Sequence, residues 1–288
     1  MHNYWRRMNK LNFGPAGFGG TILEIPKNSK NPTADAILEV SKIGLSAMEI
    51  EFVRSVYLKN SVPEKKEEIK NNAINSNVSL SIHAPYFINL NAIEEHKIIN
   101  SHRYILDSLN VGHEIGAKTI VCHIGYFLKQ EPKKVLENIS HQISLIEDKY
   151  KGDTKLGIEL TGKKTQVGSI DEIFYFIDKH PKFVKPVIDF AHQHARENGY
   201  FKDKKNVSLF FEKLKSYPEF FKNLHMHMSG IAYGEKGEKH HLPFREADLP
   251  YKEILANLKD NKTTGTVICE SPEIVEDALF LKEIYEKL

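Results

Sequence analysis

The stretch Val187-Ile188-Asp189-Phe190-Ala191-His192-Gln193-His194 decides how this chain is interpreted. Its first residues are apolar and β-branched, which predicts a buried strand. Asp189 and His192 then follow where that strand is expected to end. A strand that ends in an acid and a histidine is typical of metal or catalytic sites in α/β enzymes, but a single Asp-x-x-His fits a core strand followed by a polar loop equally well. The interpretation therefore depends on how the other strands end.

The composition predicts an ordinary globular protein. Of 288 residues, 41% are hydrophobic and 27% are charged, as in most soluble domains. No apolar run is long enough to cross a membrane and the N-terminal residues lack a signal-peptide pattern, so we expect a cytoplasmic protein without a membrane partner. A net charge of +2 does not by itself indicate a nucleic-acid partner. Cys122 and Cys269 lie in apolar runs and are predicted to be reduced packing residues.

Short apolar runs alternate with longer amphipathic segments along the chain. The predicted strands span residues 11–17, 47–53, 78–86, 118–125, 156–160, 184–190, 223–228 and 264–269. The predicted helices cover residues 32–44, 63–75, 96–115, 132–150, 207–216 and 272–287, with a further helix capped by Ser169. Successive strand–helix units of this number predict one α/β domain over residues 1–288, a (β/α)8 TIM barrel, with residues 1–10 expected to be disordered.

Two further features support or refine this architecture. An open doubly wound sheet would usually carry a dinucleotide-binding glycine loop, and the glycines at 14, 17, 19 and 20 do not have its spacing. Residues 229–248 form the one long stretch that is predicted to be irregular. A loop of that length in a compact domain is usually functional.

Acids and histidines gather where the predicted strands end, which is where a barrel places its active site. They are His83, His123, Glu159, Asp189, His192, His225, His227 and Glu270, and the loop 229–248 adds Glu238, His240 and His241. Each alone is more often a structural residue than a ligand. Together, so many carboxylates would repel one another without cations, and histidine with carboxylate suits Zn²⁺, Mn²⁺ or Fe²⁺. Because polynuclear sites recur in phosphodiester hydrolysis, the residues predict a metal-dependent hydrolase.

The ordered motifs resemble the endonuclease IV family of apurinic/apyrimidinic (AP) endonucleases, in its short archaeal-type form, over nearly the whole chain. They are Phe13-Gly14-Pro15-Ala16-Gly17, His83-Ala84-Pro85-Tyr86-x-x-Asn89-Leu90, His123-x-Gly125, Gly157-Ile158-Glu159-Leu160-Thr161, Asp189-Phe190-Ala191-His192 and Cys269-Glu270. The resemblance implies a barrel of the xylose isomerase-like superfamily. It also implies a monomeric DNA repair enzyme that cuts damaged double-stranded DNA 5′ to an abasic site, leaving a 3′-hydroxyl and a 5′-deoxyribose phosphate.

The resemblance further implies a centre of three zinc ions, with Mn²⁺ as an alternative metal. The first ion would be held by His83, His123 and Glu159, of which Glu159 is the catalytic residue that bridges to the second ion. The second ion would be held by Glu159 together with Asp189, His227 (or His225) and Glu270. The third would be held by His192, Glu238 and His241 (or His240). Tyr86 would contact DNA at the flipped-out nucleotide.

Several alternatives stay open. Spacing suits His225 about as well as His227, and His240 competes with His241 according to how the loop is aligned. Glu238 stands where the family commonly has aspartate, and no arginine match is found after the first strand. A sugar isomerase or epimerase with the same barrel would need only Glu159, Asp189, one histidine and Glu270. An inactive binder of damaged DNA is a third possibility. Basic residues near the expected mouth could contact phosphates or be solvated: Lys27, Lys30, Lys163, Lys164, Lys236 and Lys239.

Overall fold

The strands of the chain form one parallel sheet that curves into a barrel. The structure, a computed structural model, describes residues 11–19, 22–52, 56 and 63–288; the disorder expected for residues 1–10 lies outside these residues. The strand order is β1 (Leu11–Pro15), β10 (Gly265–Cys269), β7 (Leu224–Met228), β6 (Val184–Asp189), β5 (Lys155–Glu159), β4 (Thr119–Cys122), β3 (Ser79–His83) and β2 (Ala47–Glu51).

The two outermost strands of this order, β1 and β2, also meet. The Ser46 amide donates to the Phe13 carbonyl at 3.0 Å, and the Gly17 amide donates to the Glu49 carbonyl at 2.8 Å. Gly14 permits this approach, because a Cβ at that position would lie 1.8 Å from the carbonyl oxygen of Ala47. The strands thus form a nearly closed barrel, and the prediction of a (β/α)8 TIM barrel is confirmed.

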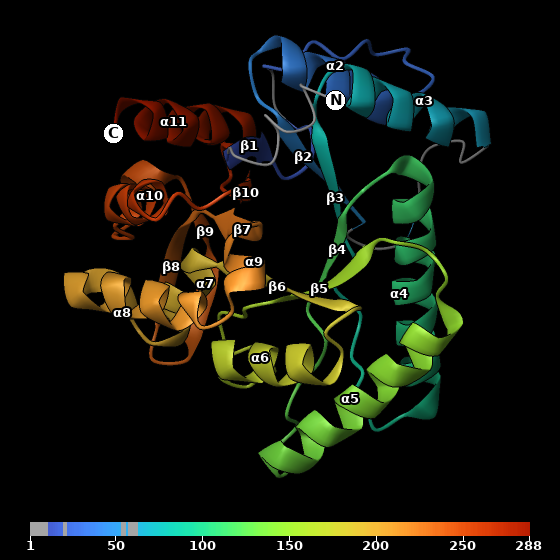
Figure 1. Cartoon of the computed structure of the whole chain (residues 1–288), viewed down its shortest axis with the longest axis vertical. Helices are drawn as coiled ribbons and strands as arrows, with labels where there is room; N and C mark the ends of the chain where they lie inside the picture. The colour runs from blue at the N-terminus through green and yellow to red at the C-terminus, as the bar shows by residue number, and fades with distance from the viewer. Residues whose placement is uncertain (1–10, 20–21, 53–55, 57–62) are drawn as a thin grey trace.

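The helices lie around the outside of the strands (Figure 1). They are α2 (Pro32–Lys42), α3 (Pro63–Asn75), α4 (Glu95–Ile115), α5 (Pro132–Lys149), α6 (Ile170–Lys179), α7 (Phe190–Arg196), α8 (Lys204–Lys215), α9 (Pro218–Phe221), α10 (Tyr251–Asp260) and α11 (Ile274–Lys287), with a 3₁₀ turn η1 (Tyr200–Lys202). Ser169 caps α6 in a capping box with Glu172, as predicted. Among the described residues, no helix is both long and apolar enough to cross a membrane.

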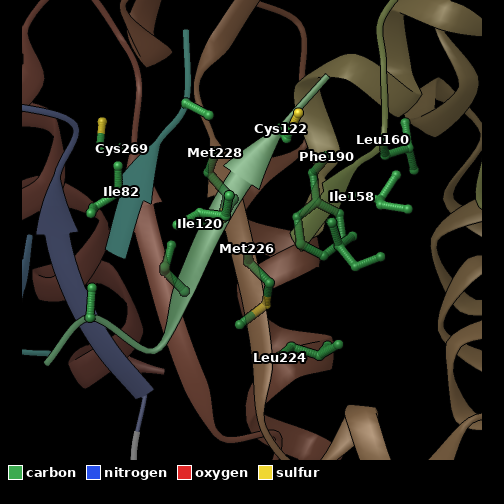
Figure 2. Packing of buried hydrophobic residues seen from close by; sticks show 14 of the residues in the cluster. Ile82, Ile120, Cys122, Ile158, Leu160, Phe190, Leu224, Met226, Met228 and Cys269 are labelled. Carbon is green, nitrogen blue, oxygen red and sulfur yellow. The ribbon is translucent and has the colours of Figure 1, made fainter. Parts of the chain in front are cut away.

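Alternation along the strands separates an apolar outer face from a polar interior. Leu224, Met226 and Met228 of β7 belong to the hydrophobic core (Figure 2). His225 and His227 lie between them in sequence and therefore point to the opposite face, into the barrel. The parallel register pairs His227 with Asp189 of β6. The polar residues of neighbouring strands consequently converge inside the carboxyl end of the barrel.

The segment 229–248, which was expected to be irregular, is largely ordered. It contains an antiparallel hairpin of β8 (Gly230–Gly234) and β9 (Gly237–Leu242), followed by a 3₁₀ turn η2 (Phe244–Glu246). The prediction was wrong because β9 is polar on both faces and a register shift between Ala232 and Tyr233 breaks the alternation. This hairpin brings the residues of the predicted loop over the barrel mouth.

The strand β6 ends one residue before expected. Asp189 closes β6, and α7 begins directly at Phe190. The Asp189 side chain caps this helix by accepting the His192 amide at 2.6 Å. A helix of seven residues is too short to show a clear apolar period, so sequence alone does not predict it.

Candidate metal centre

A cavity of about 250 Å³ opens at the carboxyl ends of the strands. Most of the predicted ligands line it: His83, His123, Glu159, His192, Glu238, His241 and Glu270, together with Tyr86, Tyr126, Lys163 and Gln166. The remaining two, Asp189 and His227, are fully buried. The structure therefore brings all the preferred positions to one end of the barrel.

His83, His123 and Glu159 form one group whose ligand atoms lie within 4.8 Å of one another. Both histidines direct Nε2 to the same carboxylate oxygen, Glu159 Oε2, at 3.4 Å from His83 and 2.6 Å from His123. His83 and Glu159 are the last residues of β3 and β5, and His123 directly follows β4, so the sheet itself fixes their spacing. This is the set expected for the first ion.

A second group shares Glu159 and lies deeper in the barrel. It consists of Glu159, Asp189, His227 and Glu270. His227 Nδ1 lies 3.1 Å from Glu159 Oε1 and 3.3 Å from Glu270 Oε1. The group contains His227 and not His225. Because one glutamate belongs to both groups, it is placed to bridge two cations.

The third group lies between α7 and the hairpin. It consists of His192, Glu238 and His241. His192 Nε2 is 3.7 Å from Glu238 Oε2 and 3.4 Å from His241 Nε2. His240 is exposed and belongs to none of the groups among the described residues. Glu238 reaches the group although it is three residues, rather than two, from the histidine.

Backbone carbonyls orient three of these imidazoles. Nδ1 lies 2.8 Å from the Ala84 carbonyl in His83, 2.9 Å from the Leu160 carbonyl in His192 and 2.9 Å from the Glu270 carbonyl in His241. A carbonyl oxygen can only accept, so each Nδ1 carries the hydrogen. In the neutral ring the lone pair is then on Nε2, which faces the cavity in the form that binds a metal.

The charges of the site also fit a cation. Burial alone would lower the pKa of His83, but Glu159 and Glu51 beside it raise this pKa to about 10. Burial alone would raise the pKa of Glu270, but His227 lowers it to about 2. Protons on imidazoles thus balance the carboxylates, and a metal would replace those protons. Glu159 Oε2 and Asp189 Oδ2 are buried and lie beside histidine nitrogens, but neither oxygen accepts a hydrogen bond from the described residues, so both could bind a metal ion.

Glu49 and Glu51 of β2 belong to the same region, and the sequence-based prediction of ligands did not include them. Glu49 is fully buried beneath His227. Burial raises the pKa of Glu51 to about 8, and its Oε1 atom has no hydrogen-bond partner in the part of the chain that the structure describes. The signal was present in Ala47-Met48-Glu49-Ile50-Glu51, where two acids two residues apart in an apolar strand must share one face.

The other predicted residues divide. The ring of Tyr86 lies 4.8 Å from that of His83, and about half of its surface is exposed (48%), so it stands at the cavity edge. His225 lies below the cavity and contacts Glu49. Of the six lysines, only Lys163 lines the described cavity. Lys164 pairs with Glu197 instead, and the remaining lysines are exposed.

Sequence comparison connects the chain to known proteins. The profile of the xylose isomerase-like TIM barrel family matches residues 37–284. An uncharacterized protein of Methanocaldococcus jannaschii is 39% identical over 258 residues, which cover 88% of this chain and 92% of the relative. A probable endonuclease 4 of Mycoplasma genitalium is 26% identical over 179 residues, 60% of each chain.

Structural comparison gives two kinds of neighbour. Endonuclease IV from Thermus thermophilus superposes with a TM-score of 0.68 and 19% identity, over 95% of this chain and 100% of that chain. The 3-keto-D-glucoside 4-epimerase from E. coli superposes with a TM-score of 0.67 and 15% identity, over 95% and 100%. At such identities the likeness shows the fold alone, which a nuclease and an epimerase share.

Proposed function

The chain belongs to the xylose isomerase-like TIM barrel family, and within it we propose an AP endonuclease that cuts double-stranded DNA on the 5′ side of abasic sites. The observation that carries this proposal is the third ligand group, His192, Glu238 and His241, next to the two groups that share Glu159. An enzyme that uses a single ion has no need of this group. A phosphodiester bond, in contrast, has an attacked phosphorus and two oxygens on which charge develops, and several cations can serve it.

The ligand chemistry supports Zn²⁺, with Mn²⁺ as an alternative. The groups offer imidazole and carboxylate, and no cysteine belongs to any of those found among the described residues. When bound, such cations polarise phosphoryl oxygens and lower the pKa of water. Glu159 belongs to two of the groups, so its carboxylate would bind one cation in each and fix their separation. The carbonyl-bound rings of His83, His192 and His241 would keep their Nε2 atoms aimed at the cavity.

Residues at the rim would position the DNA. The partly exposed ring of Tyr86 has a free surface beside the cavity, where it would fill the gap that a flipped-out nucleotide leaves. Lys163 lines the same cavity and would pair with a phosphate next to the lesion.

One observation favours a second candidate. Glu159, Asp189, His227 and Glu270 form a complete one-ion site without the other groups. A sugar isomerase or epimerase would need no more than this set. Metal content separates the two functions, because the nuclease is expected to hold about three zinc ions per chain and the isomerase one or two Mn²⁺ or Mg²⁺ ions.

The direct test is incision of a duplex that contains one tetrahydrofuran abasic analogue. Protein loaded with zinc is expected to cut it on the 5′ side, leaving a 3′-hydroxyl that a polymerase extends. The matched duplex without the lesion should stay intact. If the loaded protein cuts neither duplex but interconverts ketoses in a coupled sugar assay, the epimerase function replaces the proposal.

A further inference from the structure

The imidazole of His227 is oriented differently from those of His83, His192 and His241, because carboxylates and not backbone carbonyls face its two ring nitrogens. Its Nδ1 faces Glu159 and Glu270, at 3.1 and 3.3 Å. In the other three oriented histidines Nδ1 faces a carbonyl and Nε2 faces the cavity. His227 is thus turned the opposite way, and its Nε2 must find an acceptor inside the barrel.

Glu49 provides that acceptor. Its Oε1 lies 2.9 Å from His227 Nε2, and both atoms are buried. The two atoms are close enough for an ion pair but do not have hydrogen-bond geometry, so neither has a hydrogen-bond partner among the described residues. Glu49 comes from β2 and His227 from β7, which the strand order separates by several strands. The contact therefore runs across the interior of the barrel and not along the sheet.

The carboxylate of Glu49 is itself held in place. Its other oxygen, Oε2, accepts the Ser81 hydroxyl at 2.6 Å and the His225 Nε2 at 3.1 Å. These three side chains and that of His227 are all buried. A buried carboxylate with several donors keeps its charge and its position, so it can hold a neighbouring ring.

We infer that Glu49, supported by Ser81 and His225, is a positioning residue that turns His227 so that Nδ1 binds the middle cation. The inference rests on the metal centre of the proposed function. A carboxylate behind a metal-bound histidine fixes which nitrogen carries the proton and makes the other a stronger ligand. Here the carboxylate does for His227 what the carbonyls do for His83, His192 and His241.

Glu49, His225 and His227 could alternatively bind a cation of their own, since their ligand atoms also lie within 4.8 Å. Two observations weigh against it. The set has a single carboxylate, and the positive charge of Lys185 acts on His225 from the neighbouring strand. The middle group has three carboxylates around the other nitrogen of the same ring. The cation is therefore expected at Nδ1 of His227 and the proton at Nε2.

The test measures Zn²⁺ binding to metal-free protein in competition with a chromophoric chelator, without DNA. Glu49→Gln is expected to weaken one binding step by about 10- to 100-fold and to leave the others unchanged. The matched control is Glu147→Gln, because Glu147 also faces a buried histidine, His180, that a serine contacts on its other nitrogen. This control should bind zinc as the wild type does.

A spectroscopic measurement makes the inference independent of affinity. Long-range ¹H–¹⁵N spectra of the zinc-loaded protein should show one histidine bound through Nδ1, and its signal should be absent from His227→Gln. Unchanged zinc binding in Glu49→Gln, or His227 bound through Nε2, would overturn the inference. If the wild type binds a fourth zinc ion that Glu49→Gln loses, the inference is also overturned, because Glu49 would then belong to a separate metal site. None of these readouts depends on whether the protein cuts DNA.

Discussion

At the residue scale, His241 is a candidate metal ligand and its neighbour His240 is not. His241 points Nε2 at His192, whereas His240 is exposed on the other face of β9. We expect His241→Ala to lose one zinc ion and to incise the abasic duplex about a hundred-fold more slowly or worse, because one cation contributes several kcal/mol of charge stabilisation. His240→Ala should keep both metal content and rate. Equal metal content in the two variants, measured by elemental analysis, contradicts the assignment.

Glu51 gives a pH prediction on the same scale. Its folded-state pKa is raised by burial from 4.5 to about 8, so between these values the folded carboxyl binds a proton that the unfolded chain has lost. Stability of the metal-free protein therefore falls as pH rises through this window. Glu51→Gln removes this dependence. The free energy of unfolding of the variant, relative to that of the wild type, should therefore rise by a few kcal/mol from about pH 5 to pH 8 and then level off.

Urea unfolding of the metal-free wild type and Glu51→Gln across this pH range measures the difference. A constant difference between the two proteins would show that Glu51 is ionised throughout.

At the element scale, the β8–β9 hairpin places the third ligand group. The Tyr233 hydroxyl donates to Asp248 at 2.7 Å, and the Glu238 amide donates to the Gly162 carbonyl at 3.0 Å. Gly162 also leaves room for the Glu238 side chain, since a Cβ there would lie 2.6 Å from Glu238 Cβ and 3.1 Å from His192. The positions of Glu238 and His192 therefore depend on glycine at position 162.

Gly162→Ala should displace Glu238 and weaken the third ion by about tenfold or more, with the two deeper groups unaffected. The measurement is zinc stoichiometry after dialysis against a weak chelator. Gly19→Ala is the control, because its added methyl makes only an ordinary contact, at 3.5 Å from Ile274. Full zinc retention in Gly162→Ala would contradict this prediction, because it would show that the hairpin accommodates the added methyl group without loss of zinc affinity.

At the scale of the whole molecule, a metal centre at the carboxyl ends of the strands would connect distant parts of the barrel. Its candidate ligands come from β3, β5, β6 and β7, from the residues that follow β4 and β10, from α7 and from the hairpin, so the full set can bind cations only when the barrel is closed. Chelation should therefore lower the melting temperature. Saturating a site at about a hundred times its Kd contributes about 2.7 kcal/mol, which corresponds to roughly 5–10 °C for a domain of this size.

Calorimetry before and after treatment with a chelator, followed by addition of zinc, checks this expectation. Recovery of the original melting temperature is the expected result. An unchanged melting temperature after complete metal removal would show that the buried charges are balanced without cations.

The sequence by itself determined the barrel, the chain order of its eight strands and most of the candidate ligands. The strands Val184–Asp189 and Leu224–Met228 are apolar on one face and end in acids and histidines, and both properties are local. Because parallel strands end together, position along each strand was enough to place His83, Glu159 and Asp189 at one mouth.

Only the tertiary structure decided between close neighbours and revealed the support beneath the site. Which of His225 and His227 meets Glu159 depends on their depth in the barrel, and the choice of His241 over His240 depends on the register of a hairpin whose polar sequence hides it. The contact between Glu49 and His227 joins β2 to β7 across the barrel interior, at a sequence distance that no local pattern encodes. Closure of the barrel sets such contacts, and closure is a property of the whole chain.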